Sequence, residues 1–137
     1  MRQFVLDTSV IASWCFKDET DRYSDAVLEL LLANEGLIPS LCPYEIVNVL
    51  LVAERRKRLT NADSVQFINL LESLPIRVDP QPSDHMMNEL LALGRRYKLS
   101  AYDSAYLALA MREGLPLATR DDALKKAAKK CGVEHVT

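Results

Sequence analysis

The sequence is poor in the residues that mark several common enzyme classes. Only 4 of its 137 residues are glycine. They form neither a Gly-x-x-x-x-Gly-Lys nor a Gly-x-Gly-x-x-Gly run, which excludes a P-loop and a dinucleotide-binding turn. A Gly-x-Ser-x-Gly nucleophile elbow is missing as well. The two histidines, His85 and His135, do not stand at metal-ligand spacing. We therefore expect them to be exposed or locally hydrogen-bonded.

Cysteine and long apolar runs are also scarce. Cys15, Cys42 and Cys131 are odd in number and widely spaced, a pattern that favours reduced thiols over disulfides or a zinc site. No apolar run approaches the ~20 residues of a membrane span. Asp7 stands where a signal peptide would be apolar. These absences predict a cytoplasmic protein without a membrane partner.

Size and charge limit the remaining possibilities. A chain of 137 residues fits one domain, residues 1–137. The net charge of −2 predicts no global attraction to nucleic acid, so any polyanion contact must come from local patches. One basic patch is Arg55–Arg58, and the other combines Lys125, Lys126, Lys129 and Lys130 on one helix face. Each patch is equally compatible with a solvated helix surface.

Short apolar strands alternate with helices along the whole chain. This order predicts an α/β domain with a buried parallel sheet and helices on both of its faces. The expected strands are 3–6, 37–39, 76–78 and 115–118, with 133–136 as a further candidate. The expected helices are 10–16, 22–34, 43–58, 61–74, 82–97, 101–113 and 121–131.

Four carboxylates stand against apolar backgrounds at the ends of these elements. Asp7 follows the first strand, Glu45 lies shortly after the second, Asp121 follows the fourth, and Asp103 lies at a helix N-terminus. An isolated carboxylate on a buried element is costly unless it is neutralised. Sites in parallel sheets gather at the carboxyl ends of the strands. Because oxygen-only ligands suit Mg²⁺ or Mn²⁺ rather than zinc, the pattern predicts one shared metal site and metal-assisted phosphodiester chemistry.

Each acid also has a purely structural interpretation. Asp7 and Asp121 stand where they would cap the helices that follow them. Asp103 lies three residues after Ser100, the spacing of a capping box. Glu45 lies in the first turn of its helix, where negative charge is favoured. These alternatives remain open for each acid by itself.

Two polar pairs argue against four independent caps. Glu45 and Asn48 are the only polar residues in the segment 44–53, and their spacing places them on one face of an apolar helix. Asp103 and Ser104 likewise precede an apolar run. We expect both pairs to face inward, where they need partners.

Hydroxyl and aromatic residues near the acids have two interpretations each. Ser9 and Thr119 are expected either to contact a metal-bound water or phosphate oxygen, or to hydrogen-bond the local backbone. Trp14, Tyr44 and Tyr102 would stack a splayed base or, more commonly for large apolar groups near a core, pack against it.

Taken in order, these segments resemble the PIN domain family, and within it the VapC-type toxins. The match runs from residue 4 to about 136. The segments that carry it are Leu6-Asp7-Thr8-Ser9, Glu45 with Asn48, Tyr102-Asp103 at the head of an alanine-rich helix, and Thr119-x-Asp121.

The resemblance implies a three-layer α/β/α PIN-like domain with a central parallel sheet. It also implies an Mg²⁺- or Mn²⁺-dependent endoribonuclease that hydrolyses RNA phosphodiester bonds with metal-activated water. Carried over by position, the catalytic and metal-binding residues are Asp7, Glu45, Asp103 and Asp121. The adjacent Asp122 is an alternative to Asp121 as the fourth acid.

The resemblance further implies the toxin of a type II toxin–antitoxin pair. Such a toxin would be a homodimer, would be neutralised by a cognate antitoxin, and would cleave tRNA or rRNA. Two other functions stay open: a housekeeping PIN nuclease in RNA maturation or decay, and a non-catalytic Mg²⁺-binding α/β interaction module. A phospho-receiver, the main example of the latter, pairs two acids after its first strand, whereas Thr8 and Ser9 follow Asp7 here.

Overall fold

A four-stranded parallel sheet forms the centre of the computed structural model, which describes residues 1–19, 21–80 and 84–137. The strand order is β3-β2-β1-β4. Val5 of the central strand pairs with Leu37 on one side and with Leu117 on the other. The strands are β1 (Gln3–Leu6), β2 (Glu35–Ile38), β3 (Ile76–Val78) and β4 (Leu117–Ala118).

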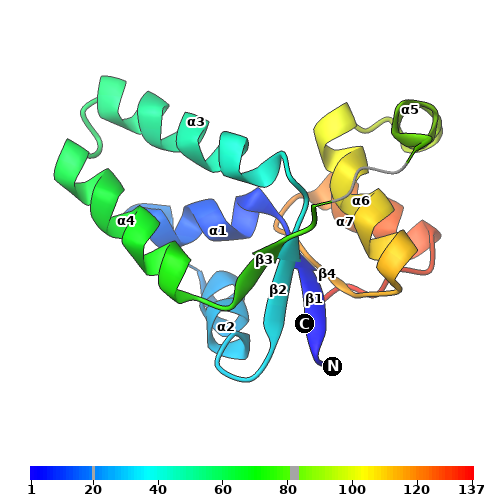
Figure 1. The fold of residues 1–137 in the computed structure, drawn as a ribbon, viewed down its shortest axis with the longest axis horizontal. Helices are drawn as coiled ribbons and strands as arrows, with labels where there is room; N and C mark the ends of the chain where they lie inside the picture. The colour runs from blue at the N-terminus through cyan, green and yellow to red at the C-terminus, as the bar shows by residue number, and fades with distance from the viewer. Residues whose placement is uncertain (20, 81–83) are drawn as a thin grey trace.

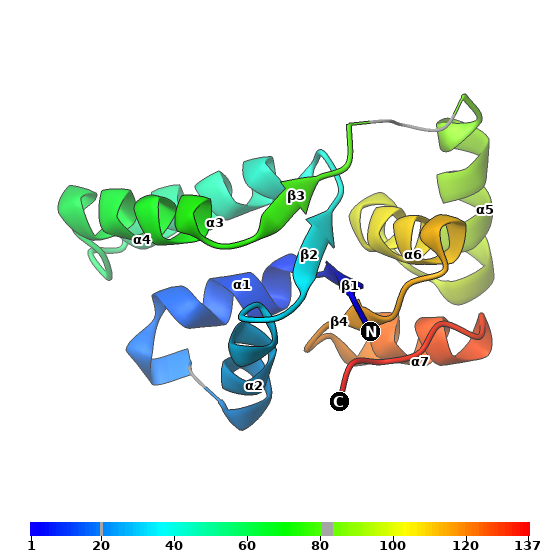
Figure 2. The same cartoon turned by 60° about the horizontal axis from the view of Figure 1, so that its bottom comes forward.

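Helices cover both faces of this sheet. Figure 1 shows α1–α4 on one side of the strands and α5–α7 on the other, and Figure 2 shows the same two groups after a rotation. The predicted three-layer α/β/α architecture is therefore confirmed. The helices are α1 (Thr8–Cys15), α2 (Arg22–Leu30), α3 (Cys42–Arg55), α4 (Asn61–Ser73), α5 (Met86–Tyr97), α6 (Ala101–Glu113) and α7 (Asp122–Lys130), with a 3₁₀ turn η1 (Lys17–Glu19).

Helix ends follow local capping chemistry. The hydroxyls of Thr60 and Ser100 accept hydrogen bonds from the third residue of α4 and of α6, and Gly114 ends α6 with a φ of 64°. Thr60 is therefore the N-cap of α4. The predicted helix start at residues 82–83 lies outside the described residues, and α5 begins at Met86.

The candidate strand 133–136 does not form a full strand. A single bridge pairs His135 with Leu117 of β4, because β4 itself has only two residues with which the returning segment can pair. Val133 and Val136 are nevertheless buried. The segment thus covers the β4 edge of the sheet with two backbone hydrogen bonds to Leu117 and with its buried valine side chains.

Helix α3 differs from the prediction in the direction that Asn48 takes. Its inward face consists of Ile46 and Leu50, whereas Asn48 is exposed together with Val47 and Leu51. The prediction that Asn48 faces inward is wrong. Because α3 carries apolar residues on both faces, the position of its polar residues does not show which face is buried.

Within the described part of the chain, no helix has the length and apolar character needed to span a bilayer.

Ser104 of α6 faces inward as the sequence predicted, because it is fully buried. The sheet and its two helical layers bring the carboxyl ends of β1, β2 and β4 to one edge, where α1, α3 and α7 begin.

Candidate functional site: a cluster of four carboxylates

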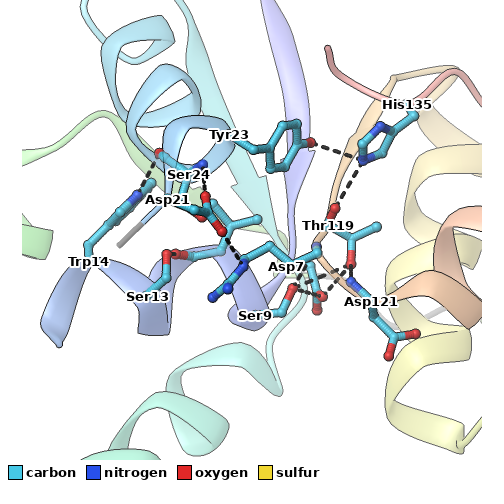
Figure 3. Close-up of polar contacts among 12 residues, drawn as sticks. Asp7, Ser9, Ser13, Trp14, Asp21, Tyr23, Ser24, Thr119, Asp121 and His135 are labelled. Atoms are coloured by element: carbon cyan, nitrogen blue, oxygen red, sulfur yellow. Dashed lines mark hydrogen bonds and ion pairs between the residues drawn. The ribbon is translucent and has the colours of Figure 1, made fainter. Parts of the chain in front are cut away.

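Asp7 lies at the end of the central strand and is almost completely buried, at 5% exposure. Its Oδ2 atom accepts hydrogen bonds from Ser9 Oγ at 2.6 Å and from Thr119 Oγ1 at 2.7 Å (Figure 3). Asp7 occupies the N-cap position of α1, yet its side chain makes no capping hydrogen bond. The capping interpretation of Asp7 is therefore wrong, and its carboxylate is held by hydroxyls from two separate elements.

The two hydroxyls also bind backbone groups. Thr119 Oγ1 accepts a hydrogen bond from the backbone of Asp121 at 3.0 Å, and Ser9 Oγ accepts one from the backbone of Arg120 at 3.0 Å. Backbone hydrogen bonding, one of the two interpretations of these residues, is confirmed. Both hydroxyls thereby join α1 to the turn that follows β4, with Asp7 between them.

Glu45 is held from the opposite side of the site. Its Oε1 atom accepts hydrogen bonds from Tyr106 Oη at 2.6 Å and from Thr8 Oγ1 at 3.0 Å. These donors belong to α6 and α1, and the two oxygens lie 2.6 Å from each other. Sequence analysis missed Tyr106, which is fully buried. The sequence feature that could have indicated Tyr106 is a tyrosine hydroxyl within an apolar run, about one helical turn after Asp103.

Asp103 connects the four acids electrostatically. It lies in the first turn of α6, where its backbone N–H donates to Ser100 Oγ at 3.0 Å. Burial raises the pKa of Asp103 to about 6, together with the charges of Asp7, Asp121 and Glu45. Asp103 therefore lies near enough to Asp7, Asp121 and Glu45 for their charges to oppose its ionisation. That the four acids share one metal site stays a prediction, and this interaction supports it.

Asp7 experiences opposing influences. Burial raises its pKa, the hydrogen bonds from Ser9 and Thr119 lower it, and the charge of Glu45 raises it further. The net direction is upward. A buried carboxylate that stays above its usual pKa despite two hydroxyl donors lies in a region short of positive charge.

Asp121 combines two roles. Its Oδ2 atom accepts a hydrogen bond from the backbone of Leu124 at 2.8 Å, so it caps α7 as the structural interpretation predicted. It also contributes to the raised pKa of Asp103. The neighbouring Asp122 is exposed and lines a groove along α7. This geometry favours Asp121 over Asp122 as the fourth acid.

A model of the PIN domain family matches residues 4–130. The chain belongs to the PIN domain family. PIN domains are generally nucleases, and these nucleases generally use divalent metal ions. A comparison with curated proteins finds no match.

Solved structures similar to this PIN domain come from several organisms. PAE2754 from Pyrobaculum aerophilum is 22% identical, with 92% of this chain and 86% of that chain covered and a TM-score of 0.70. VapBC2 from Rickettsia felis, bound to a DNA fragment from its promoter, is 14% identical, with coverages of 98% and 97% and a TM-score of 0.69. A toxin–antitoxin complex from Klebsiella pneumoniae is 21% identical, with coverages of 91% and 89% and a TM-score of 0.61. At these identities the likeness is one of fold.

The donor set of this PIN domain fits a hard cation. The four carboxylates supply only oxygen atoms, and none of the ion pairs found among the described residues involves one of them. No three histidine, cysteine or acidic side chains in the described ranges are grouped so that they could hold an ion by themselves. Mg²⁺ usually keeps several waters and takes one or two carboxylates. The chemistry of these four acids therefore fits a divalent cation that keeps part of its water shell better than a fully enclosed ion.

The aromatic residues near the acids take different positions. Trp14 is partly buried against the core and donates from Nε1 to the backbone oxygen of Ser24 at 2.8 Å, which confirms packing (Figure 3). Tyr44 and Tyr102 are 79% and 62% exposed, so packing is wrong for both. Their rings lie on the surface one residue before Glu45 and Asp103.

The basic patch Arg55–Arg58 belongs to the far end of α3. Arg58 stacks on Phe16 at 4.1 Å and pairs with Asp18 and Glu19. Arg55, the last residue of α3, stands ten residues after Glu45, about 15 Å away along the helix axis. The contacts of Arg58 with Asp18, Glu19 and Phe16 therefore give it a structural role.

Proposed function

We propose that this PIN domain is an Mg²⁺- or Mn²⁺-dependent endoribonuclease and the toxin of a type II toxin–antitoxin pair. One observation supports the metal dependence. Burial, and then the charges of Asp7, Asp121 and Glu45, raise the pKa of Asp103 to about 6. Like charges gathered in a buried site oppose folding unless a cation binds there. Such a trade of stability for binding is common at functional sites.

Within this proposal, Asp7 and Asp103 hold the cation, while Glu45 and Asp121 either join them directly or through water or orient the attacking water. A bound Mg²⁺ supplies Lewis acidity, which lowers the pKa of water and neutralises phosphate charge. The chain itself supplies orientation. Hydroxyls from Ser9 and Thr119 fix Asp7.

Glu45 is oriented in the same way by Tyr106 and Thr8, which donate to a single carboxylate oxygen. A carboxylate held in this way keeps its position when a charged ligand enters or leaves, because both donors are buried residues, one of α6 and one of α1. This preorganisation is what metal-assisted hydrolysis requires of the protein.

The partners proposed are an RNA substrate, tRNA or rRNA, a cognate antitoxin and a second copy of the chain, all in the cytoplasm. The structural likeness to VapBC2 and to the Klebsiella pneumoniae toxin–antitoxin complex supports the antitoxin partner. A neighbouring upstream reading frame for a small DNA-binding protein would add independent support.

Purified protein free of antitoxin should cleave structured RNA with Mg²⁺ or Mn²⁺, and EDTA should stop the reaction. Asp7→Asn and Asp103→Asn should each slow cleavage by about 10³-fold, which corresponds to ~4 kcal/mol of barrier. Asp63→Asn is the matched control. Asp63 occupies the same third position of its helix and follows a capping hydroxyl, but it is exposed on α4.

Three outcomes separate the competing functions. Full activity of Asp7→Asn beside an active wild type would contradict the assignment of the site. Mg²⁺ binding without any cleavage would favour the non-catalytic interaction module. Equal loss of activity in Asp63→Asn would show that the effect arises from general destabilisation instead of the carboxylate cluster.

A further inference from the structure

A surface groove of about 670 Å³ runs along α7. One wall carries Lys125, Lys126 and Lys129, and the other is the returning segment 132–135. Helix α7 starts at the acidic cluster, directly after Asp121. The returning segment runs beside β4, where His135 pairs with Leu117.

His135 marks where this return ends. Its Nε2 atom lies 2.9 Å from the backbone oxygen of Thr119, and its ring stacks on Tyr23 (Figure 3). Thr119 is also the residue whose hydroxyl holds Asp7. The groove is therefore linked to the acids at two points: its lining residue Asp122 directly follows Asp121, and its lining residue His135 contacts Thr119.

Neither an ion pair between described residues nor the helix dipole accounts for Lys125 and Lys126. Among the ion pairs that join described residues, none involves Lys125, Lys126 or Lys129. The helix dipole favours cations in the last turn, which contains Lys129 and Lys130. Lys125 and Lys126 lie before that turn, where the dipole gives no such benefit.

The charge of the groove contrasts with that of the chain. Its three lysines and two acids, Asp122 and Glu134, give +3 − 2 = +1 with His135 neutral, whereas the whole chain carries −2. Lys125 and Lys129 stand one turn apart, about 6 Å along the helix axis. Such a row can follow neighbouring phosphates of an extended strand.

We propose that this groove binds the phosphate backbone of the RNA strand on one side of the scissile bond. The inference rests on the proposed ribonuclease function and names where its substrate continues beyond the acids. Phosphate contacts of this kind set the position and register of a nucleic acid without reading its sequence. Of the four lysines that the sequence placed on one helix face, three therefore line the groove and Lys130 does not.

A binding experiment tests this division. A fluorescein-labelled single-stranded oligoribonucleotide is titrated in EDTA, so that no cleavage occurs, at several KCl concentrations. The proteins are the wild type, the triple variant Lys125→Gln/Lys126→Gln/Lys129→Gln, and Lys130→Gln as matched control on the same helix. Circular dichroism checks that each variant is folded. Should the triple variant fail to fold, Lys126→Gln takes its place.

Three lost phosphate contacts should flatten the slope of log affinity against log salt by about 2, since each contributes ~0.7 on a single strand. Affinity at low salt should fall at least tenfold. For Lys126→Gln alone the slope should flatten by ~0.7. Lys130→Gln should keep both the slope and the affinity of the wild type. With Mg²⁺, the triple variant should raise KM and leave kcat unchanged.

The failures are distinguishable. A wild type that cleaves RNA, with a triple variant of unchanged slope, would overturn the groove and leave the ribonuclease intact. An equal loss in Lys130→Gln would also overturn the groove, because general charge would then explain the binding. A wild type that neither binds nor cleaves RNA would overturn both proposals.

Discussion

Replacing Asp103 by asparagine should stabilise the metal-free protein. The pKa of this carboxyl is raised from 3.8 to about 6 by burial and by Asp7, Asp121 and Glu45. A shift of about two units corresponds to at most ~3 kcal/mol, at ~1.4 kcal/mol per unit. Asp103 is only partly buried, so solvent screening reduces this value, and we expect a gain of about 0.5–2 kcal/mol.

The sign follows from proton binding. Because the folded pKa lies above the unfolded one, the folded wild type binds more protons than the unfolded chain between about pH 4 and 6. The stability that protonated Asp103 contributes is therefore fully present at low pH and is lost as the pH rises through about 6. The advantage of Asp103→Asn should grow from pH 5 to pH 7 and then level off. The cap of α6 is retained, because Ser100 accepts from the backbone of residue 103.

Urea denaturation in EDTA at pH 5, 6, 7 and 8 measures this difference. Asp63→Asn is again the control, because Asp63 completes a capping box with Thr60 and hydrogen bonding holds its pKa below the usual value. Its replacement should leave stability unchanged or lower it, the opposite sign from Asp103→Asn. Added Mg²⁺ should raise the melting temperature of the wild type and that of Asp103→Asn less.

Two results would refute the reasoning. A lower free energy of unfolding for Asp103→Asn in EDTA at pH 8 would mean that Asp103 only supports its helix. A pH-independent gain would mean that charge repulsion is not its cause. Absence of any Mg²⁺ effect on the wild type, together with the first result, would show that the acids do not form a cation site.

Two further predictions concern the residues that hold the acids. Thr119→Val removes a hydroxyl donor from buried Asp7 and should cost about 1–3 kcal/mol at pH 8. The loss should be smaller at pH 5, where the raised pKa of Asp7 leaves more of this carboxyl neutral. Thr119→Ser, which keeps the hydroxyl, is the control. Urea denaturation at both pH values measures the difference. Asp121→Ala removes the cap of α7 and should be about 1 kcal/mol less stable than Asp121→Asn, which keeps the acceptor and relieves repulsion. Equal melting temperatures of the two variants in EDTA would contradict the capping role.

Local signals in the sequence were sufficient for most elements. Ile76–Val78 and Ala101–Glu113 have the bounds that apolar runs, Ser100 and Gly114 predicted. These features depend on neighbours within a few residues, so the sequence contains them directly. The segment 133–136 failed as a strand because its pairing depends on the length of β4, a distant element.

The sequence by itself determined the α/β/α class and the family. It also predicted the four acids as one set, because the carboxyl ends of parallel strands lie at one edge of a sheet. It could not determine what holds each acid. Thr8 and Tyr106 lie 98 residues apart and meet at Glu45, and Ser9 and Thr119 lie 110 apart and meet at Asp7. Only packing of α1 against α6 and β4 creates these contacts. The same is true of the lysines on α7: their spacing is local, but a returning segment of chain decides which of them border a groove.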